Sequence, residues 1–527
     1  MTTVPVGANG AGAAQPASPV SLSRQLIAAV VSGLALVAAF PSLDVEPLAW
    51  VAFVPLLWVT RGVRPRAAFG IGWLAGSTFF VGSIYWIVHT IGHYTALPTG
   101  VAVILLLLMS SALGCYTGTF VAVLRWLDVR GVEARWLVAP ALWVTLEWMR
   151  GWFFIGFPWN ALGYSQHRFH ALVQMAEVTG VYGVSAVVVL FNVVVADVLQ
   201  TRGVAMRRHL PALATVTTLL VVLPGLGHWR MRSLAQRPAA GTVRVGVVQG
   251  NVDQAHKWDP AFQDETQRRY DELTRAAARN GAELVTWPET ATPFFFQQPG
   301  PRRDEVLALV RDASVAVLFG SPAYDERAPR DFEQYNRAYF VDADGIERDV
   351  YDKMQLVPFG EYVPFSSLLF FVDKIVGTVG GIAPGQRATV FDGPSGRFGV
   401  LICYEGIFPR LSRQLVAGGA DYLVNITNDA WYGPTSAPHQ HLVQATFRTI
   451  ENRVPMVRAA NTGISAVIGV DGRPLWTGPL DRALWHVEDM DYLQVRTIYT
   501  RVGDVFVWLC VLTTLLALGR GLVRRGG

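Results

Sequence analysis

Long apolar runs occupy both ends of the chain, on either side of one long polar region. A helix that crosses a membrane needs about 20 mostly apolar residues. On this basis the sequence predicts a membrane domain at 22–235 with seven membrane helices, and an eighth membrane helix within 502–522. The predicted apolar segments are 25–42, 46–62, 68–91, 98–126, 136–156, 176–199, 209–228 and 504–521.

Residues 242–498 follow a different pattern, in which short apolar strands alternate with amphipathic helices. Such alternation predicts an α/β domain whose helices cover a sheet. Asp-Gly pairs at Gly345 and Gly472 mark two hairpin turns. The predicted strands are 242–250, 282–287, 315–322, 397–403 and 421–428, the hairpins are 337–353 and 464–476, and the helices are 262–281, 303–314, 410–419 and 441–453.

The overall composition agrees with a chain that is only partly soluble. Of 527 residues, 51% are hydrophobic and 16% are charged, whereas a soluble protein carries roughly a quarter charged residues. The net charge is +4, and the basic residues form no stripe with interleaved aromatic residues, which argues against nucleic acid binding. Residues 1–21 are rich in Gly, Ala, Pro and Ser, and we expect them to be a disordered tail.

Arginine is distributed unevenly among the predicted loops. The connections 61–66, 125–135, 201–208 and 520–525 hold three arginines each, whereas 42–47 and 92–99 hold none. Cytoplasmic loops carry the excess of Lys and Arg in membrane proteins. The pattern therefore predicts that both chain ends are cytoplasmic and that residues 242–498 lie on the outer face of the membrane.

The cysteines also differ in their surroundings. Cys115 and Cys510 lie in predicted membrane helices, and Cys403 is the only cysteine of the outer domain. Disulfides are permitted outside the cell, yet Cys403 has no partner within its domain. It is either a reactive thiol or a small buried hydrophobic residue.

Three polar side chains stand where predicted strands end. Glu289 follows the strand 282–287, Lys353 follows a hairpin, and Cys403 ends the strand 397–403. Ligands of open α/β sheets bind outside the carboxyl ends of strands, so these groups are expected to converge. A carboxylate can take the proton of a thiol, and an ammonium can stabilise the oxyanion that forms on an attacked carbonyl. Together they favour acyl transfer through a thioester.

At these residues the chain resembles a known superfamily. The motifs "TWPETATPF", "YDKMQLVPFGEYVP" and "LICYEGIFP" resemble the active-site motifs of the nitrilases, or carbon–nitrogen hydrolases. With the membrane segments on either side, the chain is similar to the bacterial apolipoprotein N-acyltransferases. The motifs that add to this likeness are "EWMRGWFFIGFPWNALGYSQ", "VVQGNVDQAHKWD", "NITNDAWYG" and "VRAANTGISAVI".

The resemblance implies a fold and a set of roles. It implies an αββα sandwich for 242–498, with Glu289 as general base, Lys353 as oxyanion stabiliser and Cys403 as acyl carrier. It implies no metal ion or cofactor. The residues that match supporting positions of the family are Glu361, Tyr404, Glu405 and Trp258.

The resemblance also implies a reaction and its partners. Cys403 would take an acyl chain from a membrane phospholipid, typically the sn-1 chain of phosphatidylethanolamine. The N-terminal α-amine of a diacylglyceryl-cysteine on an apolipoprotein would then take the chain as an amide, in the last step of lipoprotein maturation. We expect a monomer in the bacterial plasma membrane.

Two alternatives remain at this point. A membrane-tethered amidase or nitrilase would use the same three residues on a soluble substrate, but a single anchor would suffice for it. A transporter or receptor would explain the membrane helices, but they hold few ionisable residues and show no internal repeat of the kind that transporters often have.

Three further features are ambiguous in the sequence. Glu147 and Arg150 are expected to pair with each other, with seating of phospholipid headgroups as the alternative. The apolar loops 292–300 and 364–381 are either core or segments that dip into the bilayer, and we favour the second. The histidines of "HQH", His439 and His441, are a weak metal signal.

Overall fold

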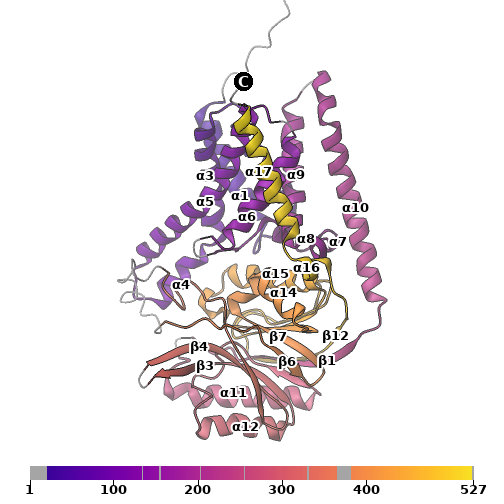
Figure 1. Ribbon diagram of the computed structural model, residues 1–527. Helices are drawn as coiled ribbons and strands as arrows, with labels where there is room; N and C mark the ends of the chain where they lie inside the picture. Colours follow the sequence, from indigo (N-terminus) through magenta and orange to yellow (C-terminus); the bar gives the residue numbers. More distant parts are fainter. Residues whose placement is uncertain are drawn as a thin grey trace, which may run out of the picture.

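The computed structural model describes residues 20–132, 134–153, 156–201, 203–254, 256–328, 331–364 and 381–524. A bundle of helices forms one end of the molecule and two β-sheets with flanking helices form the other (Figure 1). The first and the last long helices both belong to the helical end (Figure 1).

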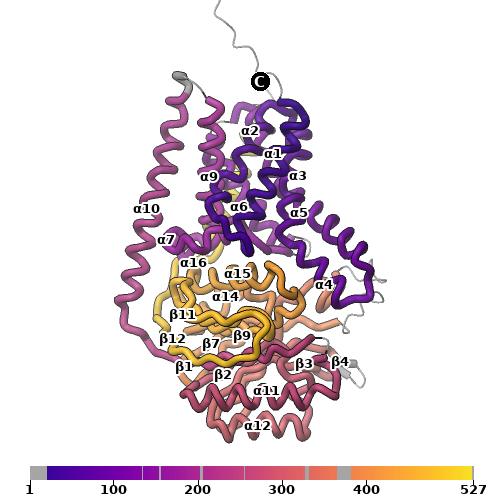
Figure 2. The backbone as a smooth tube through the Cα atoms, turned by 180° about the vertical axis from the view of Figure 1, so that it is seen from behind, coloured from indigo at the N-terminus to yellow at the C-terminus, as the bar shows by residue number. Residues whose placement is uncertain are grey.

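The helical end is built from the described residues up to Ala235 and from the last two helices of the chain. In the bundle α3 packs against both α1 and α5, and α6 packs against α9 and α17. The long helix α10 stands at the side of the bundle and leads into the first strand (Figure 2). The elements are α1 Leu22–Ala38, η1 Glu46–Trp50, α2 Val54–Thr60, α3 Pro65–Ser83, α4 Trp86–Tyr94, α5 Thr99–Val129, α6 Arg135–Arg150, η2 Leu162–Gln166, α7 His170–Val173, α8 Ala176–Thr179, α9 Val181–Leu199, η3 Gly203–His209, α10 Leu210–Ala235, α16 Ile498–Val502 and α17 Val505–Val523.

Fewer helices are long enough to cross a membrane than the sequence predicts. Among the described residues, four helices pass by length and composition (the spans at 99–129, 181–199, 206–235 and 505–523), or up to five if the bent pair α3–α4 is one span. The predicted count of eight is therefore too high. The other apolar segments form shorter helices: α1 has 17 residues, α6 has 16 and contains Pro140, and 46–60 is split between η1 and α2.

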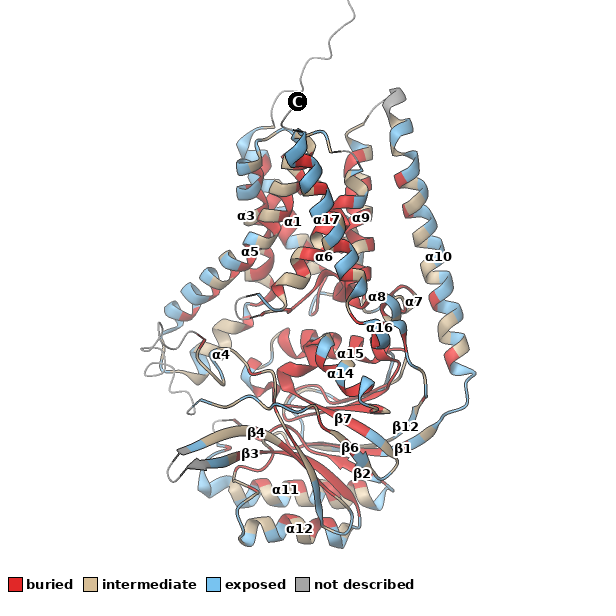
Figure 3. Cartoon of the chain, viewed as in Figure 1, coloured by how far each residue is buried: buried red, intermediate tan, exposed pale blue. Residues whose placement is uncertain are grey.

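The arginine-rich connections meet at one end of the bundle. Arg61 and Arg135 lie 3.5 and 3.7 Å from the carboxylate of Asp197, and Arg130 donates to the carbonyl of Gly521 at 2.8 Å. This end lies opposite the two sheets (Figure 1). Between this arginine-rich end and the two sheets, the bundle helices have exposed faces that carry many large apolar side chains (Figure 3).

The other end of the molecule contains two six-stranded sheets. The first has the order β12-β1-β2-β3-β4-β5 and the second has the order β11-β10-β9-β8-β7-β6. The central strands are parallel, β1 to β2 to β3 in one sheet and β7 to β8 to β9 in the other. The strands are β1 Gly241–Gln249, β2 Leu284–Thr286, β3 Ala316–Ala328, β4 Asp331–Val341, β5 Glu347–Asp352, β6 Val390–Gly393, β7 Gly396–Ile402, β8 Tyr422–Thr427, β9 Met456–Ala460, β10 Ala466–Ile468, β11 Pro474–Thr477 and β12 Leu484–Tyr492.

The sheets and helices form layers. The inner faces of both sheets share one buried apolar core. A second core lies between the first sheet and the helices α11 Pro260–Arg279 and α12 Pro301–Ala313. The outer face of the second sheet, the helices α14 Pro409–Ala417 and α15 Ala437–Asn452, and the membrane-type helices share a third. The predicted αββα sandwich is confirmed, and its α14–α15 layer is the one that seats it on the bundle (Figure 1).

The loop at 292–300 is part of this sandwich. Phe296 is fully buried, and its ring centroid lies 4.8 Å from that of Phe319 and 5.0 Å from that of Tyr339. These rings belong to the core under α11 and α12, on the side of the sheets that faces away from the bundle (Figure 1). The expectation that this loop dips into the bilayer is wrong. For the second apolar loop, residues 365–380 lie outside the described residues.

The burial of Phe296 gives a testable prediction for stability. Replacing a buried Phe by Ala removes its transfer free energy and leaves a cavity, at a cost of about 3–5 kcal/mol. We expect Phe296→Ala to lower the free energy of unfolding by that amount, as measured by denaturant or thermal unfolding in detergent. Phe295→Ala, at a half-buried position, is the matched control and should cost clearly less. Equal and negligible losses would place the loop outside the core.

Candidate active site

Glu289 lies just beyond the short parallel strand β2, separated from its last residue by Trp287 and Pro288. The carboxylate is buried, and its Oε1 accepts hydrogen bonds from Asn336 Nδ2 at 2.7 Å and Lys353 Nζ at 3.1 Å. Its Oε2 accepts from the backbone N–H of Asn428 at 3.0 Å, and this residue follows β8 in the second sheet. Glu289 therefore connects the carboxyl ends of the two sheets.

A close approach of two backbones positions Glu289. A Cβ added to Gly320 on β3 would lie 2.8 Å from the Cα of Glu289 and 2.4 Å from the nitrogen of Thr290. Real Cβ contacts essentially never come this close. A side chain at Gly320 would consequently displace the segment that carries the carboxylate.

Lys353 follows β5 and is almost completely buried, with 1% of its side chain exposed. Its backbone N–H donates to the carbonyl of Asn336 at 2.9 Å. Its ammonium donates to two carboxylates, Glu289 Oε1 at 3.1 Å and Glu361 Oε1 at 2.9 Å. Asn336 Nδ2 also donates to Glu361 at 2.9 Å, so one amide and one ammonium together bridge the two acids.

The charges in this cluster stabilise one another. Burial by itself raises the pKa of Glu289, but Lys353 and the hydrogen bond from Asn336 outweigh it, and the pKa is lowered overall. Burial likewise lowers the pKa of Lys353, but Glu289 and Glu361 outweigh it and raise that pKa well above its usual value. The carboxylate of Glu289 and the ammonium of Lys353 are consequently both charged at neutral pH.

Cys403 is the first residue after β7 and begins the short helix η4 Cys403–Ile407. Its φ of +52° lies in the left-handed region, which costs a residue other than glycine of order 1–3 kcal/mol. Burial, followed by the charge of Glu289, raises the pKa of the thiol, while Lys353 acts against this. The resting thiol is therefore protonated and needs a base for attack.

Glu405 joins the segments that carry Lys353 and Cys403. Its Oε1 accepts from the backbone N–H groups of Met354 and Gln355 at 2.7 and 3.0 Å, and its Oε2 accepts from the N–H of Ile402 at 2.7 Å. The side chain is fully buried, and burial raises its pKa to about 7. Its contacts are those of a residue that holds two loops together.

The other two residues named from the sequence lie in different surroundings. The hydroxyl of Tyr404 donates to the carbonyl of Gly156 at 3.3 Å, which joins the residue after the cysteine to the helical end of the molecule. Trp258 is 46% exposed. Among the described residues no hydrogen bond or ring contact links its indole to Glu289, Lys353 or Cys403.

Sequence reasoning missed a second lysine in the cluster. Lys257 is buried, and its Nζ donates to the carbonyl of Glu289 at 3.2 Å and to Thr290 Oγ1 at 2.7 Å. Burial lowers its pKa to about 8, although Glu289 acts against this. The one signal in the sequence is the rarity of lysine, since the chain has only three. Two of them, Lys257 and Lys353, contact Glu289 in the structure.

The two histidines of "HQH" do not share a site. His439 is exposed, whereas His441 is fully buried on α15. His441 contacts Asp429 and the backbone carbonyl of Cys403. Nothing in the spacing of the two histidines indicated that one of them touches the cysteine loop.

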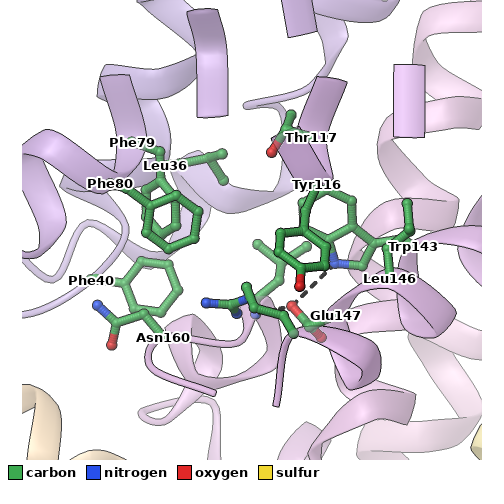
Figure 4. A pocket seen from close by; sticks show the side chains of 12 residues that line it. Leu36, Phe40, Phe79, Phe80, Tyr116, Thr117, Trp143, Leu146, Glu147 and Asn160 are labelled. Atoms are coloured by element: carbon green, nitrogen blue, oxygen red, sulfur yellow. Dashed lines mark hydrogen bonds between the residues drawn. The ribbon is translucent and has the colours of Figure 1, made fainter. Parts of the chain in front are cut away.

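Glu147 and Arg150 form no direct ion pair in the described part of the chain, although each is the main opposite charge that acts on the other. Glu147 Oε1 accepts from the N–H of Leu162 at 2.7 Å, and Arg150 Nη1 donates to the carbonyl of Trp159 at 2.6 Å. Both line a hollow at the end of the bundle next to the sheets, where Glu147 lies among aromatic side chains (Figure 4). They hold the segment 159–162, which contacts the helix α15 of the sandwich.

Comparisons with known proteins agree with this architecture. The family model "Apolipoprotein N-acyltransferase N-terminal domain" matches residues 32–194, and the model "Carbon-nitrogen hydrolase" matches residues 244–483. Among solved structures, an amidase from Nesterenkonia sp. is similar at 20% identity and a TM-score of 0.38, over 52% of this chain and 97% of its own. Most of the two sheets and the cluster of Glu289, Lys353 and Cys403 lie within the residues that the carbon–nitrogen hydrolase model matches.

Curated relatives are similar over nearly the whole chain. The apolipoprotein N-acyltransferase of Geobacter metallireducens is 40% identical over 93% of each chain. That of Agrobacterium fabrum is 32% identical over 86% of this chain and 87% of its own. The chain belongs to the apolipoprotein N-acyltransferase family.

The position of Lys257 predicts a change in pH dependence. Its ammonium favours the ionised form of Glu289, so Lys257→Met should raise the pKa of Glu289. If Glu289 acts as a base, the acidic limb of the kcat/KM profile should move to higher pH. Lys257→Arg, which keeps the charge, should leave the limb nearer its original place. A limb that moves to lower pH, or that stays in place with the protein folded, would contradict this account of the cluster.

Proposed function

We propose that this chain transfers an acyl chain from a membrane phospholipid, through a thioester on Cys403, to the N-terminal α-amine of diacylglyceryl-cysteine on apolipoproteins. Membership of the family supports the overall reaction. The observation that carries the assignment of residues is the buried Glu289–Lys353 pair, which lies close enough to Cys403 for both charges to act on its thiol.

In the first half-reaction the ester of the phospholipid is broken and a thioester forms. Glu289 accepts the thiol proton as the sulfur of Cys403 attacks the ester carbonyl. The ammonium of Lys353 stabilises the oxyanion of the tetrahedral intermediate. The intermediate collapses when the ester oxygen leaves with the proton held by Glu289, and a lysophospholipid departs.

In the second half-reaction the thioester is converted to an amide. The free α-amine of the diacylglyceryl-cysteine attacks the thioester carbonyl, and Glu289 accepts the proton that the nitrogen loses. Lys353 again stabilises the oxyanion. The sulfur leaves and regains the proton from Glu289, so the thiol is restored and the acylated lipoprotein departs. Because one nucleophile serves two substrates in turn, the kinetics should be ping-pong.

Glu361 and Asn336 keep this machinery charged and in place. A lysine that lost its proton could not stabilise an oxyanion, and burial alone would favour that loss. Glu361 is a second carboxylate on the same ammonium, at 2.9 Å. Asn336 holds both carboxylates from β4, so that Glu289 can take and return a proton without moving away from Lys353.

We place the catalytic domain, residues 242–498, on the outer face of a bacterial plasma membrane. The support is the cluster of arginine-rich connections at the opposite end of the bundle, since such loops are cytoplasmic. Residues 22–235 and 502–522 make the membrane domain in this proposal. All eight apolar segments contribute to it, the shorter pieces by completing the bundle. The chain acts as a monomer, and phosphatidylethanolamine is the preferred donor.

Trapping the thioester tests this proposal. Protein in detergent is incubated with phosphatidylethanolamine that carries a labelled sn-1 chain, and protein-bound label is measured before and after neutral hydroxylamine. We expect label that neutral hydroxylamine removes from the wild type and from Cys115→Ser, and none on Cys403→Ala. Label that persists on Cys403→Ala would contradict the assignment of Cys403 as acyl carrier. A folded wild type that takes up no label would favour an amidase that acts on soluble substrates.

A further inference from the structure

A buried histidine contacts the backbone of the nucleophile. His441 Nε2 lies 3.1 Å from the carbonyl oxygen of Cys403. The ring is fully buried, and its other nitrogen, Nδ1, lies 3.0 Å from Asp429 Oδ1 and 3.2 Å from Arg458 Nη2. None of the steps of the proposed reaction uses this ring.

The partners of the ring decide where its proton sits. A carbonyl oxygen only accepts hydrogen bonds, so Nε2 carries a hydrogen and donates to Cys403. At Nδ1 either state finds a partner, since a protonated nitrogen donates to Asp429 and an unprotonated one accepts from Arg458. The donor to Cys403 is therefore present whatever the protonation state of Nδ1.

A buried ion pair fixes the position of the ring. Arg458 Nη2 lies 2.7 Å from Asp429 Oδ2, and both side chains are fully buried. Thr427 Oγ1 donates to Asp429 Oδ1 at 3.0 Å. Asp429 follows β8 and Arg458 lies on β9, so two strands of the second sheet hold the ring of His441.

Cys403 needs such a holder because its backbone is in an unfavourable conformation. Its φ of +52° persists only when its surroundings fix it. Glu405 holds the N–H of Ile402 just before the cysteine, and His441 holds the carbonyl just after it. With the second hydrogen bond removed, the loop is free to relax and to move the thiol away from Glu289.

The same turn of α15 is seated on the helical end of the molecule. Gln440, next to His441, accepts from the indole of Trp159 at 2.8 Å and donates to the carbonyls of Pro41 and Ser83 at 3.0 and 3.1 Å. The ring centroids of Trp159 and His441 are 5.8 Å apart. His441, which binds the cysteine loop, is thus held in place both by the second sheet and by the helical bundle.

We propose that His441 is a positioning residue for Cys403, and that its Nε2–H, by holding the cysteine carbonyl, keeps the thiol in line with Glu289 and Lys353. The acyl-transfer part of this inference rests on the proposed function. The positioning part does not, because it predicts the reactivity of the thiol toward any small electrophile.

Two amide variants separate this role from general support of the fold. Glutamine places its side-chain N–H₂ near the position of Nε2, whereas asparagine is one methylene shorter and reaches only to the position of Nδ1. We would measure thioester formation from labelled phosphatidylethanolamine and alkylation of Cys403 by iodoacetamide, together with the unfolding temperature, for His441→Gln and His441→Asn. His439→Gln and His439→Asn, at an exposed position on the same helix, are the matched controls.

We expect the rates of both thiol reactions to fall more in the variant whose side-chain amide is too short to reach the carbonyl of Cys403. His441→Asn should slow both reactions of the thiol by roughly a hundred-fold, the scale of a small misplacement of a reacting group. His441→Gln should recover most of that loss, and the His439 variants should match the wild type. Equal rates for His441→Gln and His441→Asn, whether fast or slow, would overturn the proposal. If the wild type forms no thioester, the proposed function fails, and the alkylation rates still decide the role of His441.

Discussion

A buried cluster of opposite charges is the constraint on which the rest of the catalytic end depends. Glu289 and Glu361 supply two negative charges, and Lys353 and Lys257 supply two positive ones, all in or next to one hydrogen-bonded group. Buried ions are tolerated only when they are paired and hydrogen-bonded. Removing one partner leaves an uncompensated charge, which is strongly destabilising. The cluster therefore needs every segment that carries it to stay in place.

The layered fold meets this need by bringing strand ends together. Glu289, Lys353 and Asn336 come from the first sheet, whereas Cys403 and Asn428 come from the second. The N–H of Asn428 on the carboxylate of Glu289 joins the two sheets at this edge, and Glu405 joins the loops after β5 and β7. The backbone of Cys403 is the strained element, since it is held in the left-handed conformation between fixed neighbours.

The helical end contributes more than an anchor. Tyr404 touches Gly156, and Gln440 binds Trp159, Pro41 and Ser83, so the cysteine loop and the helix α15 both rest on segments between the membrane-type helices. This coupling gives a physical reason for a carbon–nitrogen hydrolase fold and an apolar bundle to occur in one chain.

Most of the strands, both hairpins and the placement of Glu289, Lys353 and Cys403 near strand ends followed from the pattern of the sequence, because burial and turn chemistry are local. The strands β6, β9 and β12 were not predicted. Hydropathy overestimated the membrane helices, since it cannot show that a segment such as 46–62 breaks into two short helices. Hydropathy also placed Phe296 at the bilayer rather than in the protein core, because it does not distinguish an apolar loop that packs in a core from one that contacts lipid. Glu147 and Arg150 interact through their charges without a direct ion pair in the described part of the chain, because Leu162 and Trp143 hold the Glu147 carboxylate and the carbonyl of Trp159 holds Arg150. Lys257 and His441 act through backbone carbonyls that only the fold brings within reach.

The central claim is that one thiol carries an acyl chain from a membrane lipid to an amine. The most direct measurement supplies the purified protein with phosphatidylethanolamine whose two chains differ in mass and with a synthetic peptide that begins with diacylglyceryl-cysteine, and analyses the peptide by mass spectrometry. The account predicts a mass increase equal to the sn-1 chain, located on the α-amine and absent with Cys403→Ala. A peptide that stays unmodified while the protein hydrolyses soluble amides, or an α-amine acylated equally well by Cys403→Ala, would contradict it.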